Sequence, residues 1–395
     1  MEETVIVSGV RTPFGSFGGS LSGIPATELG SLVIREAMSR INIDGSQIDE
    51  VLMGNVIQAS LGENPARLAG VNAGVNVKAP AMTVNKVCGS GMKTIALADQ
   101  AIRLGEAEII VAGGFENMSR APYLLTDARF GYRMGDGKLV DSLFQDGLMC
   151  GLENCHMGVT AENVAADFNI SREEMDEFSA WSQQKVAKAQ AEGKFAAELL
   201  PVSIPQRRGD PIIMEVDEHP RADTTKERLN RLPPAFMGEG GSVTAGNSAG
   251  INDGAAATVV MSKSRAQRLG LKPLGIIRAF ASAGVEPRVM GIGPIPATRK
   301  VLQRAGLELK DIDLIELNEA FAAQSLAVGK ELGWDWDRVN VNGGAIALGH
   351  PVGASGTRLV MTLLYEMERR NARYGLATMC CGGGMGVAMV VERPR

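Results

Sequence analysis

Cys88 is the first residue of this 395-residue chain whose surroundings suggest chemistry, because it lies in the stretch "NKVCGSGMKTI". A strand-like run precedes it and a glycine-flanked helix start follows. A thiol at a helix N-terminus feels the positive end of the helix dipole and the free backbone N–H groups, which lower its pKa. The functional interpretation is a nucleophile. The alternative is a buried structural cysteine.

His350 is one of only three histidines and lies among closely spaced glycines in "VNGGAIALGHPVGASG". Glycine lets other atoms approach the backbone closely. This setting favours a general base beside a bound substrate. A hydrogen-bonded loop histidine is the alternative. His219 lies in "DEHPRAD", a solvated-looking loop, and is assigned no role.

Cys380 and Cys381 stand directly before "GGGMG". Adjacent cysteines lack the spacing of a zinc site. One interpretation is that both cysteines are small core residues at the end of a strand. The other is that one of the two thiols projects into a site, beside glycine N–H groups that hold an anion. Asn318 and Glu319 in "ELNEAF" also end a predicted strand, where they contribute to a site or cap a helix.

The elements that must position these residues follow an alternating pattern. Short β-branched runs predict strands, and apolar residues at helical spacing predict helices. This alternation favours an α/β protein whose mostly parallel sheet is covered by helices. The predicted strands are 4–10, 49–56, 107–114 and 274–284, and the predicted helices are 25–41, 91–105 and 295–307.

The two ends of the chain resemble each other. Segment 312–321 parallels 48–57, segment 338–345 parallels 82–89, and segment 375–386 parallels 108–116. The shift is nearly constant, since Asp49 and Asp313 lie 264 positions apart and Asn85 and Asn342 lie 257 apart. An internal duplication explains this better than chance similarity between two α/β units.

A region of different composition, about 119–247, separates the repeats. It is rich in polar and loop-forming residues, and we interpret it as an insertion in the first half. Its predicted helix at 171–193 begins with Ser171 and Glu174, which are spaced as a capping box. Segment 242–261 is expected to form a small-residue helix followed by a strand.

Bulk composition excludes several classes of protein. The net charge of −5 disfavours nucleic acid as a partner, because phosphate binding needs a basic surface. No apolar run approaches the roughly 18 residues of a membrane helix, so no membrane role is expected. Five cysteines, an odd number, and an acidic first segment without a signal pattern predict a cytoplasmic protein.

Four motifs in this order, "NKVCGSGMKTI", "NEAF", "GGAIALGHPVGASG" and "CCGGGMG", resemble the thiolase family. The resemblance extends over nearly the whole chain. It implies a layered αβαβα fold of two duplicated halves, each a mixed sheet covered by helices. Residues 1–268 would form the first half, with the loop-domain insertion at about 119–247, and residues 269–395 the second. The stretch "HMGVTAENVA" is similar to the acetyl-CoA acetyltransferase branch.

The resemblance also implies a role for each reactive residue. Cys88 would carry the acyl group, and His350 would accept its proton and help to hold the thioester oxygen. Cys380 would remove the α-proton of a second acetyl-CoA. Asn318 would hold a water that forms an oxyanion hole with His350, and the N–H groups of Cys88 and Gly382 would form another. No metal or redox cofactor is expected.

Coenzyme A would lie along the insertion. Two departures from the family pattern stand out: Ala249 follows Ser248 where a serine usually precedes the glycine, and Cys381 replaces an aliphatic residue. By resemblance, the residues that line the coenzyme A path are Leu148, His156, Met157, Arg221, Phe236, Ala245, Ser248, Met290 and Phe321.

The implied activity is an acetyl-CoA C-acetyltransferase, which reversibly condenses two acetyl-CoA to acetoacetyl-CoA and CoA. The alternatives are a broad-range 3-ketoacyl-CoA thiolase of fatty-acid degradation, a non-catalytic acyl-CoA-binding protein of the same fold, and a decarboxylating ketoacyl synthase. The last would usually need a second active-site histidine, for which no matching motif is found. The resemblance also implies a homotetramer.

Overall fold

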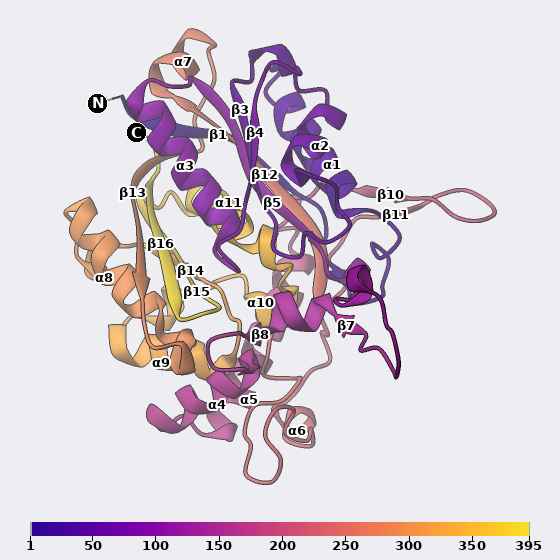
Figure 1. Ribbon diagram of the computed structural model, residues 1–395. Helices are drawn as coiled ribbons and strands as arrows, with labels where there is room; N and C mark the ends of the chain where they lie inside the picture. The colour runs from indigo at the N-terminus through magenta and orange to yellow at the C-terminus, as the bar shows by residue number, and fades with distance from the viewer. Residues whose placement is uncertain (1, 395) are drawn as a thin grey trace.

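One mixed sheet runs through the computed structural model, which describes residues 2–394 (Figure 1). Its main path has the order β14-β15-β16-β13-β1-β12-β5-β3-β4, and β2 pairs with β12. The strands are β1 (Thr4–Arg11), β2 (Gly15–Ser16), β3 (Glu50–Gly54), β4 (Ala81–Val84), β5 (Ile109–Asn117), β12 (Asn252–Ser262), β13 (Gly275–Gly284), β14 (Leu314–Leu317), β15 (Tyr374–Cys381) and β16 (Met385–Glu392).

The strand order confirms the duplication. The first half reads β1-β12-β5-β3-β4 and the second reads β13-β16-β15-β14, with parallel pairing of β3 to β5 and of β14 to β15. The two halves meet where β1 pairs with β13, at Val5 opposite Ile276. The counterpart of β4 is reduced to a short bridge between Ile315 and Val339.

The expectation of a mostly parallel sheet is wrong, because one returning strand in each half runs antiparallel. β16 follows β15 through a tight turn in which Gly383 and Gly384 have φ angles of 78° and 82°. A short hairpin can join only antiparallel strands. β12 returns after the long insertion and pairs antiparallel with both β1 and β5.

Helices cover both faces of each half and give the layered arrangement. α3 and α11 pack against each other between the halves, α1 and α2 cover the outer face of the first half, and α8 and α9 belong to the second. These helices are α1 (Ala26–Ser39), α2 (Pro65–Asn72), α3 (Ser90–Leu104), α8 (Pro294–Ala305), α9 (Ala322–Leu332) and α11 (Val352–Arg370).

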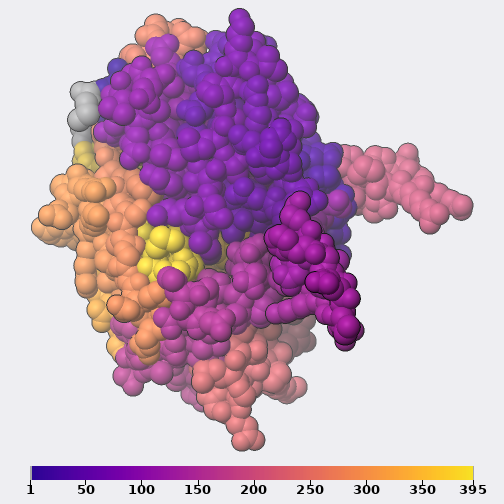
Figure 2. Space-filling view, in the orientation of Figure 1, coloured from indigo at the N-terminus to yellow at the C-terminus, as the bar shows by residue number. Residues whose placement is uncertain are grey.

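The segment between β5 and β12 adds small sheets and further helices. Figure 2 shows that the β10–β11 hairpin and the segment around β7 project from the body. The elements here are β6 (Tyr123–Leu124), β7 (Val140–Asp141), β8 (Met149–Cys150), β9 (Cys155–His156), α4 (Met157–Asp167), α5 (Arg172–Ala191), β10 (Val202–Ile204), β11 (Ile212–Met214) and α6 (Lys226–Leu229). The other short helices are α7 (Lys263–Arg268) and α10 (Ala345–Leu348).

In this segment one predicted helix is confirmed and another is absent. The predicted capping box of α5 is present, with the Ser171 and Glu174 side chains each bonded to the other's backbone. The helix expected at the start of 242–261 is absent, and only the strand β12 forms. The segment is instead a loop held by side chains: Glu162 accepts the N–H groups of Ser242 and Val243, and Asn247 accepts that of Thr244.

A buried arginine joins this segment to the first strand. Arg11, at the end of β1, is fully buried and donates to Glu198 at 2.6 Å and to both carboxylate oxygens of Asp217 at 2.6 and 2.9 Å. Asp217 also accepts the backbone N–H of Phe14 at 2.8 Å. The loop that begins at Asp217 is therefore held firmly against the N-terminal half.

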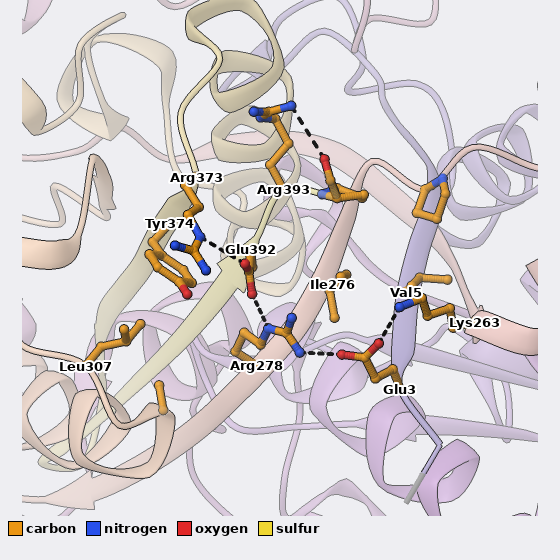
Figure 3. A pocket seen from close by; sticks show the side chains of 13 residues that line it. Glu3, Val5, Lys263, Ile276, Arg278, Leu307, Arg373, Tyr374, Glu392 and Arg393 are labelled. Atoms are coloured by element: carbon orange, nitrogen blue, oxygen red, sulfur yellow. Dashed lines mark hydrogen bonds and ion pairs between the residues drawn. The ribbon is translucent and has the colours of Figure 1, made fainter.

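An ion-pair chain crosses the seam between the halves. Glu3 pairs with Lys263 at 2.6 Å and with Arg278 at 2.5 Å, and Glu392 pairs with Arg278 at 2.5 Å and with Arg373 at 3.1 Å. These side chains line a cavity of about 680 Å³ (Figure 3). This series of ion pairs links the residue before β1 to strands β13 and β16.

No helix within residues 2–394 combines the length and the apolar character that crossing a membrane requires.

Candidate active site

A strained turn presents Cys88 between β4 and α3. Val87, just before it, has a φ angle of 49°, which is rare for a β-branched residue and stores strain. Ser90 holds the turn, because its hydroxyl donates to the Val87 carbonyl at 2.6 Å and accepts the N–H of Lys86 at 2.8 Å. The turn leaves Cys88 partly exposed on the wall of a cavity.

The pKa of Cys88 differs from the sequence expectation. Desolvation in the cavity raises it to about 11, although the backbone N–H groups of Gly382 and of Cys88 itself oppose the shift. The predicted lowering by the helix N-terminus is therefore wrong, since the loss of water around the thiolate outweighs it. The resting group is a neutral thiol that needs a base.

His350 lies between α10 and α11 in a defined orientation. Its Nδ1 is 2.6 Å from the Ser355 hydroxyl, which donates to the Pro351 carbonyl at 2.9 Å. The hydroxyl proton is thereby used, so Nδ1 must be the donor to Ser355. The other ring nitrogen, Nε2, then carries a lone pair and faces the Asn318 amide nitrogen at 3.3 Å.

Burial keeps the His350 ring neutral. Desolvation, with a smaller contribution from the positive charge of Arg358, lowers its pKa to about 3. A neutral imidazole whose Nε2 lone pair makes only the long contact of 3.3 Å with the Asn318 amide nitrogen can accept a proton. The resting site therefore combines a neutral thiol with a neutral base.

Asn318 and Glu319 have different tasks. Asn318 is fully buried, and within residues 2–394 its Oδ1 has no hydrogen-bond partner. Glu319 points away from His350 and accepts from Ser182 at 2.7 Å, from Asn340 at 2.7 Å and from the Ile346 N–H at 3.2 Å. It therefore holds the loop that leads to His350.

The adjacent cysteines occupy opposite faces of β15, as strand geometry requires. Cys380 belongs to an apolar cluster that includes Met290 and Phe321 of the cavity wall. Desolvation by burial, followed by the proximity of Cys88, raises the pKa of Cys380. Cys381 packs beneath Gly89, where an added Cβ would lie 2.7 Å from its sulfur. Cys380 thus shares an apolar cluster with two residues of the cavity wall, whereas Cys381 lies under the Cys88 turn.

One cavity of about 550 Å³ collects most of the predicted site. Cys88, His350 and Gly382 line it, whereas Cys380 and Asn318 are fully buried and absent from its wall. All nine residues expected along the coenzyme A path also line it, namely Leu148, His156, Met157, Arg221, Phe236, Ala245, Ser248, Met290 and Phe321.

Stacked rings form the outer wall. The His156 ring lies parallel to the Phe236 ring with centroids 4.6 Å apart, and Phe321 meets Phe236 edge-on at 6.2 Å. The Ser248 hydroxyl, in turn, donates to the Thr244 carbonyl at 2.7 Å. Much of this wall is therefore flat and apolar.

Sequence reasoning missed three residues at or near the site. Ser355 orients His350, and His219 lines the cavity despite its polar surroundings in sequence. Glu116, at the end of β5, is buried and accepts N–H groups of Val56, Ile57 and Gly353 at 3.0 to 3.1 Å. The place of Glu116 at a strand end, and the spacing of Ser355 four and five residues after Pro351 and His350, were available signals. Nothing in the sequence points to His219.

Glu116 links the loop after β3 to the first turn of α11, just beyond His350. Desolvation is the main cause that raises its pKa to about 7, and the surrounding N–H groups oppose this.

For metals, no cluster of three or more His, Cys, Asp or Glu side chains in residues 2–394 is placed to hold an ion.

Cys88 and His350, from distant segments, thus line one cavity of a duplicated α/β fold, and the Cys380 thiol is buried nearby. Such an arrangement is suited to thiol chemistry on a bound substrate. The family model described as "Thiolase, N-terminal domain" matches residues 4–264, and "Thiolase, C-terminal domain" matches residues 271–393. The chain belongs to the thiolase family.

Relatives and a solved structure agree with this assignment. The chain is 57% identical to an acetyl-CoA acetyltransferase of Pseudomonas aeruginosa over the full length of both. It is also 57% identical to an acetyl-CoA acetyltransferase of Escherichia coli, again over both full lengths. The crystal structure of the Bacillus anthracis acetyl-CoA acetyltransferase superimposes with a TM-score of 0.97, at 43% identity, over 100% of this chain and 99% of that one.

Proposed function

We propose that this protein is an acetyl-CoA C-acetyltransferase that reversibly condenses two acetyl-CoA to acetoacetyl-CoA and CoA. The observation that carries the proposal is that Cys88 and His350 line one cavity, with the Cys380 thiol buried close enough to Cys88 to affect its titration. The names of the relatives support acetyl-CoA as substrate. They do not favour the broad-range thiolase or the non-catalytic binding protein.

The first half-reaction acetylates Cys88. Its thiol gives its proton to His350 Nε2 while the sulfur attacks the carbonyl carbon of acetyl-CoA. The bond to the CoA sulfur breaks, and the leaving thiolate takes the proton of Cys380. The raised pKa of Cys380 supports this role, because the group is protonated at rest. Free CoA departs and leaves acetyl-Cys88, a Cys380 thiolate and a protonated His350.

The second half-reaction forms the carbon–carbon bond. The Cys380 thiolate removes an α-proton from a second acetyl-CoA, and the resulting enolate carbon attacks the acetyl group on Cys88. The bond between the acetyl carbon and the Cys88 sulfur breaks. His350 returns its proton to that sulfur, so acetoacetyl-CoA leaves and all three groups regain their resting states.

Two sets of donors stabilise the oxyanions. The N–H groups of Cys88 and Gly382, which both approach the Cys88 sulfur, would hold the thioester oxygen on that residue. The buried, unpartnered Oδ1 of Asn318 supports a water there, which together with protonated His350 would hold the enolate oxygen. One such donor typically lowers a barrier by about 2.7–4 kcal/mol.

We further propose that coenzyme A lies along the wall formed by the nine residues named above, with its extended pantetheine arm against the stacked rings. The proposed reaction uses acetyl-CoA, acetoacetyl-CoA and CoA and needs no metal or redox cofactor. A cytoplasmic location suits a site that depends on reduced thiols, and all five cysteines are free.

We also retain the division into residues 1–268 and 269–395, with the insertion at about 119–247, and the homotetramer. The two matched family models support the division. Exposed apolar side chains on the projecting segment around β6 and β7 support self-association. They are Tyr123, Leu125, Phe130, Met134 and Leu139.

A thiolysis assay tests the activity. Acetoacetyl-CoA and 3-ketoacyl-CoA esters of longer chain are compared at fixed CoA concentration. The proposal predicts a kcat/KM for acetoacetyl-CoA well above that for the longer esters. Equal or higher values for long chains would favour the broad-range enzyme, and no thiolysis of any ester would exclude both.

A further inference from the structure

All three histidines of the chain line the same cavity, although they lie far apart in sequence. His350 serves as the proposed base, and His156 stacks on Phe236. The proposed mechanism gives His219 no task. Its place in the cavity wall therefore needs an explanation of its own.

The backbone around His219 is anchored on its N-terminal side. Asp217 is fixed by the buried guanidinium of Arg11, and Glu218 accepts the N–H of Ser16 at 2.8 Å. A loop held by consecutive carboxylates has little freedom to withdraw its next side chain from the cavity. His219 is thus preorganised in the way that binding residues require.

The His219 ring also lies directly on the backbone of Gly250. A Cβ at that position would lie 2.3 Å from the ring Cε1 and 2.6 Å from Nε2. Two residues further on, the Asn252 side chain accepts the backbone N–H of His350 at 3.0 Å. The same short segment, 250–252, therefore contacts both histidines.

The chemistry of the ring follows from its neighbours. Desolvation, then the charge of Arg221, lowers the pKa of His219, so the ring is neutral near pH 7, although Asp217 opposes this. The Ile346 carbonyl lies close enough to the ring to oppose the lowering slightly as well. A neutral imidazole has one N–H, so its other nitrogen is an acceptor.

We propose that His219 is a substrate-binding residue, whose free ring nitrogen accepts a hydrogen bond from an amide N–H of the pantetheine arm. The inference rests on the proposed function in one respect, because it takes an acyl-CoA as the ligand. An acceptor suits this place, since the pantetheine amides offer N–H donors and the rest of the wall is largely apolar.

A pair of variants tests the contact. His219→Phe keeps a flat ring on Gly250 but has no acceptor, whereas His219→Gln keeps an amide oxygen. His219→Phe should raise the KM for acetyl-CoA about two- to twelvefold, the usual effect of one lost hydrogen bond, and change kcat less than twofold. His219→Gln should restore most of the affinity. An unchanged KM in His219→Phe, or an equal rise in both variants, would overturn the proposal.

S-acetylpantetheine locates the contact. If His219 binds the arm, His219→Phe loses the same factor in kcat/KM with this truncated substrate as with acetyl-CoA. A loss confined to acetyl-CoA would place the contact on the nucleotide and refute the proposal. Calorimetric titration with CoA tests the His219 contact independently of the proposed acetyltransferase activity. Weaker CoA binding to His219→Phe than to the wild type would support the contact even if the enzyme does not condense acetyl-CoA. Equal binding to both proteins would refute the contact.

Discussion

At the scale of single residues, the site rests with its reactive groups uncharged. Cys88 has a pKa of about 11 and His350 one of about 3, both because the cavity excludes water. Proton transfer from thiol to imidazole then occurs only when a substrate is positioned to use it. This resting state protects the thiols from stray electrophiles.

The first prediction concerns the pH dependence of alkylation. Only the thiolate reacts with iodoacetamide, and a pKa of about 11 leaves its fraction rising about tenfold per pH unit between pH 7 and 9. The alkylation rate of Cys88, measured by mass spectrometry, should follow this slope without a plateau. A plateau below pH 8 would mean that the helix N-terminus lowers the pKa after all.

Ser355 carries a second prediction at this scale. It fixes the His350 tautomer, so Ser355→Ala should lower kcat about tenfold, the effect of losing a hydrogen bond of about 1.4 kcal/mol. KM should stay within twofold. Ser355→Thr keeps the hydroxyl and should recover most of the rate. Steady-state kinetics of all three proteins decide, and an unaffected kcat in Ser355→Ala would remove this orienting role.

At the scale of elements, the helices and strands that could be predicted are those whose signals lie in the local sequence. Helix α5 was predictable because Ser171 and Glu174 are spaced as a capping box, which the structure contains. The segment at 242–251 was not, because its backbone is satisfied by Glu162 from a distant helix. The same limit hid His219, whose neighbours only the folded chain supplies, whereas the partners of Ser355 lie four and five residues before it.

Gly89 provides a test of how closely β15 supports the Cys88 turn. A Cβ there would lie 2.7 Å from the Cys381 sulfur, so Gly89→Ala should displace the turn and lower kcat at least about tenfold, as small misplacements at reacting atoms do. Cys381→Ala alone should stay near the wild-type rate. The double variant should recover part of the loss, and purely additive effects would contradict this contact.

At the scale of the whole molecule, two kinds of ion pair join its parts. Arg11 is fully buried with Glu198 and Asp217, whereas Arg278 at the seam is about one-third exposed. Removing a buried partner leaves uncompensated charge, while exposed pairs contribute little. The duplication itself was visible in the sequence, but these links were not, because they join segments about 200 to 275 positions apart.

The corresponding prediction compares two matched variants. Arg11→Met should lower the free energy of unfolding by about 3–5 kcal/mol, and Arg278→Met by about 1 kcal/mol or less. Urea denaturation followed by circular dichroism measures both. Arg11→Met should also weaken CoA binding, because Asp217 anchors the loop of His219. Similar destabilisation by the two variants would contradict this account.

The most direct test of the account asks which sulfur carries the acetyl group. Cys380→Ser is incubated with isotopically labelled acetyl-CoA, quenched in acid and mapped by peptide mass spectrometry, with Cys88→Ala as the control. The account predicts label on Cys88 in Cys380→Ser, no acetoacetyl-CoA formation, and no label in Cys88→Ala. Label on any other residue, or stable label in Cys88→Ala, would contradict it.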